Sequence, residues 1–131
     1  MNRRGEIINF ILFVLTPLFL GLFIYLVGRS DSVRVVNWFD LNWSISIPVW
    51  VNYNLPDGLF AFALMSSIPI IWNIENKQIR FWEIICITFL FAIEFGQLFI
   101  ISGAFDLMDL LFIFIAILIY YFIKRQTFYI L

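Results

Sequence analysis

Four long apolar stretches divide the 131-residue chain. The first, Ile7 to Val27, has 21 residues without a charge, and as a helix rising about 1.5 Å per residue it reaches about 30 Å, the thickness of a bilayer core. Shorter uncharged stretches run from Gly58 to Ile74 and from Leu110 to Ile123, and a longer apolar stretch between them contains two glutamates. We therefore predict membrane spans at 7–27, 57–74, 81–101 and 107–123.

The composition agrees with this pattern, because 63% of the residues are hydrophobic, only 13% are charged, and the mean hydropathy is +0.99. A chain of this kind is an integral membrane protein. The predicted fold class is an all-α membrane protein, a four-transmembrane-helix bundle in a single domain spanning residues 1–131. The rings of Pro17 and Pro69 interrupt the helical hydrogen-bond ladder, so kinks are expected there. A signal peptide is rejected for the first stretch because its apolar run is too long and no small-x-small cleavage site follows it.

An aromatic-rich segment, 28–56, separates the first two predicted spans, and its rings are typical of a membrane interface. From Trp43 to Tyr53, apolar and other residues alternate with a period of two, which predicts a strand-like segment that Pro48 would restrict to an edge. The segment is either an external cap over the helices or a lid or docking surface. In the docking alternative, a membrane-protein partner would bind through Trp38, Trp43, Trp50 and Tyr53.

The basic residues predict the orientation, because Lys and Arg concentrate in cytoplasmic segments. With the N-terminus inside, six of the eight basic residues are cytoplasmic, and only Arg29 and Arg34 are external. We therefore expect a multi-pass chain with both termini in the cytoplasm and an external segment 28–56. The net charge of −1 gives no basic field for nucleic acid.

Several kinds of chemistry are closed to this chain because it has no histidine and one cysteine, Cys86. Histidine-based catalytic triads, histidine metal sites and thiolate zinc clusters are excluded, as is an internal disulfide. We predict no cofactor and no metal, and we expect Cys86 to pack as an apolar residue.

Polar side chains instead gather in the outer half of the bilayer. Counted from the external helix ends at about 1.5 Å per residue, Glu94 lies about 12 Å deep, Gln97 about 7 to 8 Å and Asp109 about 4 to 5 Å. Asp57 and Asp106 stand at the external ends of their helices. These five residues are the predicted ligand-binding set. A hydrogen bond between Gln97 and Asp109 is expected across the short hairpin.

Each acid also has a purely structural interpretation. Asp57 and Asp106 suit the capping of helix N-termini, and Asp109 suits the positive end of a helix dipole. Glu94 lies too far from a helix end for that role, so its structural alternative is a hydrogen-bonded tie to Ser66 or Ser67. The functional alternative is a polar cavity, open to the outside, in which Glu94 binds a cationic or hydroxyl-bearing group or moves a proton.

The order of these residues resembles VanZ-like membrane proteins. Asp57 heads the second span, Glu94-x-x-Gln97 ends the third, and Asp106-x-x-Asp109 opens the fourth, so that the resemblance covers roughly residues 55–121. The chain departs from the family at three places. Gly103 and Ile113 stand where the family often has arginine and asparagine, and the residues near Phe60 include no histidine.

The resemblance implies a protein of the bacterial cytoplasmic membrane with an envelope-related or antibiotic-resistance role at its outer face. Three functions remain open. The first is recognition of an envelope lipid or amphiphile by the polar outer-leaflet pocket. The second is an enzyme acting on a lipid-linked envelope intermediate, with Glu94 as acid or base and Asp106 or Asp109 orienting the substrate or a divalent cation. The third is an accessory or immunity-type subunit that docks through the aromatic segment.

Overall fold

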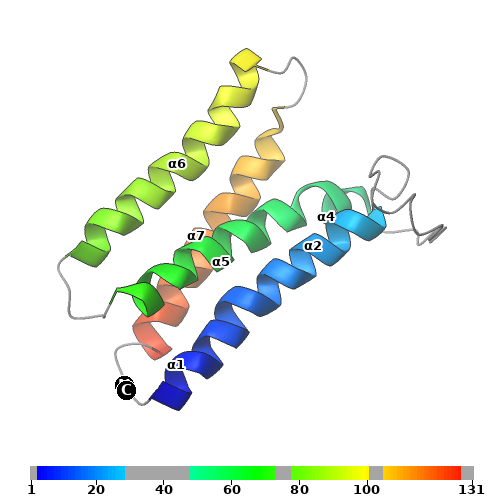
Figure 1. Ribbon diagram of the computed structural model, residues 1–131. Helices are drawn as coiled ribbons and strands as arrows, with labels where there is room; N and C mark the ends of the chain where they lie inside the picture. The colour runs from blue at the N-terminus through cyan, green and yellow to red at the C-terminus, as the bar shows by residue number, and fades with distance from the viewer. Residues whose placement is uncertain (1–2, 29–47, 73–77, 101–104, 128–131) are drawn as a thin grey trace.

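Helices make up the fold, as a computed structural model shows for residues 3–28, 48–72, 78–100 and 105–127 (Figure 1). They form four long helical segments. The first consists of α1 (Arg3–Phe10), a π-helical stretch η1 (Ile11–Leu15) and α2 (Thr16–Gly28), and the second of α4 (Val49–Tyr53) and α5 (Leu55–Ile71). The third is α6 (Gln78–Ile100) and the fourth is α7 (Leu107–Thr127).

All four segments are long and apolar enough to cross a membrane. Each of them also exposes large apolar side chains, among them Phe19 at 61%, Ile71 at 65%, Phe99 at 89% and Phe122 at 66%. Water penalises such exposure by about 25 cal/mol per Å² of apolar surface, whereas acyl chains do not. For the residues that the structure describes, the prediction of a helical, multi-pass membrane chain is therefore confirmed.

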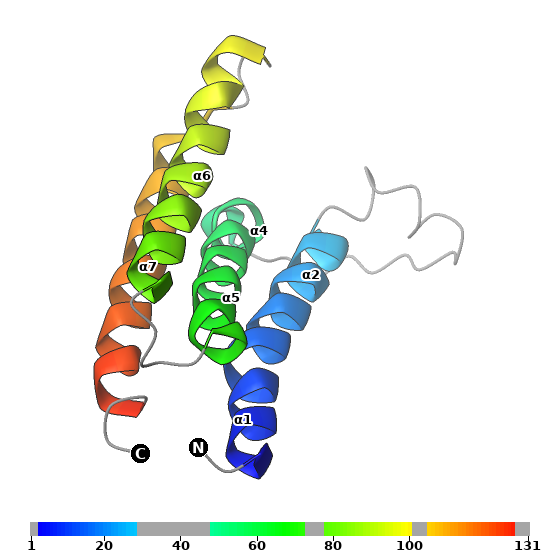
Figure 2. The ribbon, with the colours of Figure 1, turned by 60° about the vertical axis from the view of Figure 1, so that its left-hand side comes forward.

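Helix α5 lies at the centre of the bundle, where it contacts α2, α6 and α7. Figure 1 shows α6 at the edge farthest from α2. The start of α1 and the end of α7 lie at one end of the bundle (Figure 2). We call the opposite end, where α4 and the first turn of α7 lie, the acidic end, because it holds Asp57, Asp106 and Asp109.

Small residues allow α5 to approach its neighbours closely. A Cβ atom on Gly58 would lie 3.2 Å from the backbone oxygen of Phe112 in α7, and one on Gly21 of α2 would lie 3.0 Å from the ring of Phe60. Small residues are the usual contacts between membrane helices, since burying apolar surface against another helix gains little in lipid. The core between α5, α6 and α7 is completed by Ala61, Met65, Ile68, Ile79, Ile113, Ala116, Ile117 and Tyr120, with Cys86 packed against it as expected.

The period-two pattern from Trp43 to Tyr53 predicted a strand, and this prediction is wrong for its second half. Residues Val49–Tyr53 form helix α4, with Pro48 as its N-cap at ψ 139°. The second span therefore begins near Val49 rather than at residue 57, and it ends at Ile71 rather than at residue 74. Residues 43–47, with most of the external segment, lie outside the described residues.

Contacts with other helices hold α4 in place. The side-chain amide of Asn52 donates to the backbone oxygen of Gly28 at 2.7 Å, and a Cβ atom on Gly28 would collide with the Asn52 side chain. The ring of Trp50 stacks on Phe112 of α7 at 6.1 Å. These tertiary contacts explain why α4 is helical although its local hydrophobic pattern favours a strand.

The first segment contains an irregularity next to Pro17. Proline lacks the N–H that a regular helix needs at that position, and the residues before it, Ile11–Leu15, are π-helical. Both the backbone N–H and the hydroxyl of Thr16 donate to the oxygen of Ile11, the hydroxyl at 2.9 Å. Pro69 lies near the end of α5, which stops two residues later.

Candidate functional site

Helix α6 turns two acidic residues toward the bundle. Its fully buried residues are Ile79, Glu83 and Glu94. Glu83 and Glu94 are eleven residues apart, which is close to three helical turns, so they share one face of α6 at a separation of about 16 Å. The two carboxylates therefore lie in the same interface, and their surroundings decide what each one does.

Glu83, near the start of α6, is fully partnered. It forms a salt bridge with Lys124 of α7 and accepts hydrogen bonds from the hydroxyls of Tyr120 at 2.5 Å and Tyr121 at 3.4 Å. Glu83 and Lys124 are exposed by only 3% and 6%. Buried charges are stable when they are paired and hydrogen-bonded in this way. Sequence analysis did not find this cluster, because Glu83 and Lys124 are 41 residues apart and each stands close to the end of a span.

Glu94, near the other end of α6, has a different environment. It is 6% exposed, and its Oε2 atom has no hydrogen-bond partner among the residues that the structure describes. The nearby charges that act on it are the carboxylates of Asp109 and Asp57, and Asp109 acts more strongly. Burial and like charge both oppose the ionised form of a carboxyl group.

Asp106 and Asp109 are held together by Asn54, a residue that sequence analysis missed. Its side-chain amide donates to Oδ1 of Asp109 at 2.6 Å and to Oδ2 of Asp106 at 3.3 Å. Asn54 is 4% exposed and lies between α4 and α5. The signal in the sequence was an asparagine two residues before Pro56, at the N-cap of α5.

The structural role expected for Asp106 is confirmed. Its Oδ1 atom accepts a hydrogen bond from the backbone N–H of Met108 at 2.9 Å, at the start of α7. Asp57 lies in the first turn of α5, but α4 precedes it, so Asp57 does not begin the second span as predicted. Asp109 lies in the first turn of α7 as expected.

Two hydrogen bonds that sequence analysis predicted are absent between the residues the structure describes. Asp109 accepts from Asn54, not from Gln97. The Ser67 hydroxyl donates to the backbone oxygen of Leu64 at 2.7 Å, and no hydrogen bond joins Glu94 to Ser66 or Ser67. Helical rotation and side-chain rotamers decide these pairings, and depth along a helix does not specify either.

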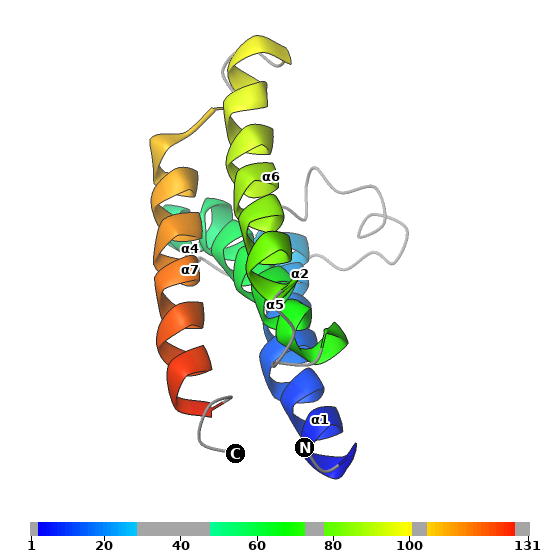
Figure 3. The same cartoon turned by 90° about the vertical axis from the view of Figure 1, so that its left-hand side faces the viewer.

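The two ends of the α6–α7 pair differ in the charges that surround the buried glutamate. Figure 3 shows the two helices side by side and antiparallel. At one end Glu83 meets the cation Lys124, and at the acidic end Glu94 is repelled by Asp109. Exposure rises from buried Glu94 through half-buried Asp109 to exposed Asp106. The acidic residues therefore become more buried from the end of the bundle toward Glu94.

The aromatic docking surface can be described only in part. Trp50 and Tyr53 are 53% and 48% exposed, and both belong to α4. Trp38 and Trp43 lie outside the described residues. Trp50 also stacks on Phe112, so part of its surface contributes to packing within the bundle.

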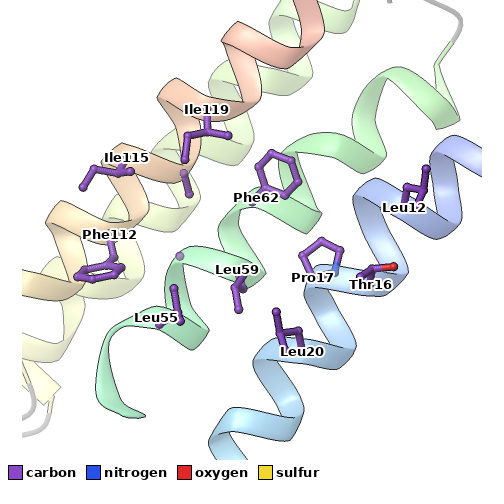
Figure 4. Close-up of a pocket in the computed structure, with 12 residues that line it drawn as sticks. Leu12, Thr16, Pro17, Leu20, Leu55, Leu59, Phe62, Phe112, Ile115 and Ile119 are labelled. Carbon is purple, nitrogen blue, oxygen red and sulfur yellow. The ribbon is translucent and has the colours of Figure 1, made fainter. Parts of the chain in front are cut away.

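A separate groove of about 410 Å³ lies between the first segment, α5 and α7. Figure 4 shows Leu59 and Phe62 of α5 between Pro17 and the α7 side chains Phe112 and Ile115. The lining is apolar except for Thr16, whose hydroxyl is already bonded to Ile11. The groove offers no charged group to a ligand, so the candidate functional site is the acidic set around Glu94.

Comparisons with known proteins find no matching family model, no similar curated protein and no similar solved structure. The resemblance to VanZ-like proteins thus rests on the polar pattern of the sequence. The chemistry of the site depends on its carboxylate groups, whose oxygens accept hydrogen bonds when ionised.

Proposed function

We propose that this chain is a divergent VanZ-like protein of the bacterial cytoplasmic membrane, whose acidic end faces outward and recognises an envelope lipid or amphiphile. The ligand contacts Glu94, Gln97 and the aspartates Asp57, Asp106 and Asp109. Asn54 holds Asp106 and Asp109 in place. The protein then acts in envelope function or antibiotic resistance by binding.

One observation carries this proposal: the buried Oε2 atom of Glu94 has no hydrogen-bond partner among the described residues. An acid inside a membrane span is costly and points to function unless the protein satisfies it. The chain satisfies Glu83 with three side chains from α7. Glu94 is similarly buried, and no described residue partners its Oε2 atom, which supports a partner supplied from outside the chain.

The orientation follows from the basic residues. Arg3, Arg4, Arg80 and Arg125 belong to the helical ends opposite the acidic end, and such residues favour the cytoplasmic side. The acidic end then lies in the outer leaflet, where envelope precursors and amphiphilic antibiotics are found. Ile113, where VanZ-like proteins often have asparagine, is 2% exposed in the core, so it takes no part in the proposed site.

We expect Glu94→Gln to reduce the bound lipid or amphiphile retained through purification by about tenfold or more, equivalent to about 1.4 kcal/mol. Protein extracted from bacterial membranes is washed with mild detergent, and the retained molecules are identified by mass spectrometry. Glu6→Gln is the matched control, because Glu6 is exposed on α1 at the other end. Equal retention by wild type and Glu94→Gln would contradict the proposed function.

A further inference from the structure

We propose that the ligand of this site carries a primary ammonium group, which binds between Glu94 and Asp109 as Lys124 binds Glu83. This inference rests on the proposed function and names the chemical class of its ligand. The ligand is an amphiphile of the phosphatidylethanolamine type, with acyl chains in the bilayer and an amine at its polar end.

Hydrogen bonding supports an N–H donor. Glu94 is 94% buried as a residue. Its Oε2 atom is an acceptor that has no hydrogen-bond partner among the described residues. Oδ1 of Asp109 accepts a bond from Asn54, and Oδ1 of Asp106 accepts one from Met108. The acidic residues therefore offer further carboxylate lone pairs, while a primary ammonium group has three donors and no acceptor. A hydrogen bond between an ammonium and a carboxylate is among the strongest in proteins.

Charge supports a cation. Asp109 and Asp57 act on Glu94 with the same sign of charge, and carboxylates near each other in a region of low dielectric constant repel strongly. A cation placed between them converts that repulsion into attraction. An anionic ligand, such as a phosphate group, would add to the repulsion.

The other end of the same interface provides an internal example. Glu83 lies on the same face of α6 as Glu94 and is paired with the primary ammonium group of Lys124. Asp109 and Lys124 occur at opposite ends of α7, in its first turn and near its last. The interface thus contains an ammonium–carboxylate pair at one end, whereas at the other end no described residue supplies Glu94 with a cation.

The arrangement suits an ammonium group better than a metal ion. Among the described residues, no three His, Cys, Asp or Glu side chains are grouped closely enough to hold a metal. An ammonium group is larger than a metal ion, and it binds through separate hydrogen bonds that need no closed coordination shell.

The test compares phospholipids with the same acyl chains and different headgroups. Native mass spectrometry of the purified protein in detergent measures the dissociation constants of phosphatidylethanolamine, phosphatidylcholine and phosphatidylglycerol. Phosphatidylethanolamine carries the primary ammonium, phosphatidylcholine has the charge without N–H donors, and phosphatidylglycerol has hydroxyls without the cation. Soluble glycerophosphoethanolamine tests the need for acyl chains.

We expect wild type to bind phosphatidylethanolamine at least about tenfold more tightly than the other two phospholipids and the soluble amine. Glu94→Gln should remove this preference, and Glu6→Gln should keep it. Because Asp57 is only half-buried, Asp57→Asn is a second variant, with a smaller loss of preference, if Glu94→Gln does not fold.

Four outcomes would overturn the inference. Glu94-dependent binding that favours phosphatidylglycerol would exclude an ammonium ligand and leave the proposed function intact. Equal binding of phosphatidylcholine and phosphatidylethanolamine would exclude the N–H donor, and equal binding of the soluble amine would exclude an amphiphile. If no lipid depends on Glu94 and washing retains none, the proposed function fails as well.

Discussion

Replacing Lys124 with methionine is expected to lower the free energy of unfolding by about 3–5 kcal/mol, because the change leaves Glu83 buried without its cation. The carboxylate would keep the tyrosine hydroxyls at 2.5 and 3.4 Å. Neutral donors offset only part of the cost of burying a charge. The unfolding of purified protein in mixed micelles, followed by circular dichroism, measures the loss.

The double variant Glu83→Gln with Lys124→Met should recover at least half of this loss, because removing both charges leaves no unpaired ion. Arg80→Met removes a charge from the exposed first turn of α6 and should change the stability by no more than about 0.5 kcal/mol. If Lys124→Met proved as stable as Arg80→Met, the salt bridge would have no role in joining α6 to α7.

The second large effect is expected for Asn54→Asp, which replaces a shared hydrogen-bond donor with a third carboxylate. Asn54 donates to both Asp106 and Asp109, and a hydrogen bond to a charged group contributes about 1.5–3 kcal/mol. We expect a loss of about 2–4 kcal/mol in the free energy of unfolding, together with reduced lipid retention. The same unfolding and washing assays measure both quantities.

Exchanging the two partners provides a sharp control. In the double variant Asn54→Asp with Asp109→Asn, an amide and a carboxylate again face each other across the 2.6 Å contact. Most of the lost stability should return, because the number of charges near Asp106 is restored. A double variant no more stable than Asn54→Asp would show that Asn54 does not act through this contact.

The four spans could be predicted from the sequence because each needs only a long run of apolar residues. The helical state of Val49–Tyr53 could not, because its alternating pattern fits a strand equally well. The contacts of Trp50 with Phe112 and of Asn52 with Gly28 hold this part of the chain. Both partners are distant in the sequence, so a local pattern does not contain the deciding interactions.

The depth of the candidate site along the helices could be predicted from the sequence, but the hydrogen-bond partners of its residues could not. Counting about 1.5 Å per residue placed Glu94 and Asp109 toward the same end of the bundle, and their electrostatic interaction agrees with that placement. The partner of Asp109 proved to be Asn54, which belongs to the junction of α4 and α5. Because this junction was predicted to be extended, nothing in the sequence placed Asn54 beside Asp109.

The salt bridge between Glu83 and Lys124 was missed for a related reason. Each residue alone fits the end of a membrane span, where charges are common. Their pairing depends on the register of α6 against α7, which the apolar residues around them do not specify. Once the register is known, the site is supported by the contrast between partnered Glu83 and Glu94, whose Oε2 atom has no hydrogen-bond partner among the described residues.

The account depends most on what lies beside the Glu94 carboxylate in a membrane. A crystal structure grown in a lipid mesophase that contains phosphatidylethanolamine would show this directly. We predict a headgroup nitrogen within about 2.7–2.9 Å of a Glu94 oxygen, with Asp109 on its other side. A Glu94 carboxylate bonded to Ser66 or another residue of the chain, with no headgroup nearby, would contradict the account.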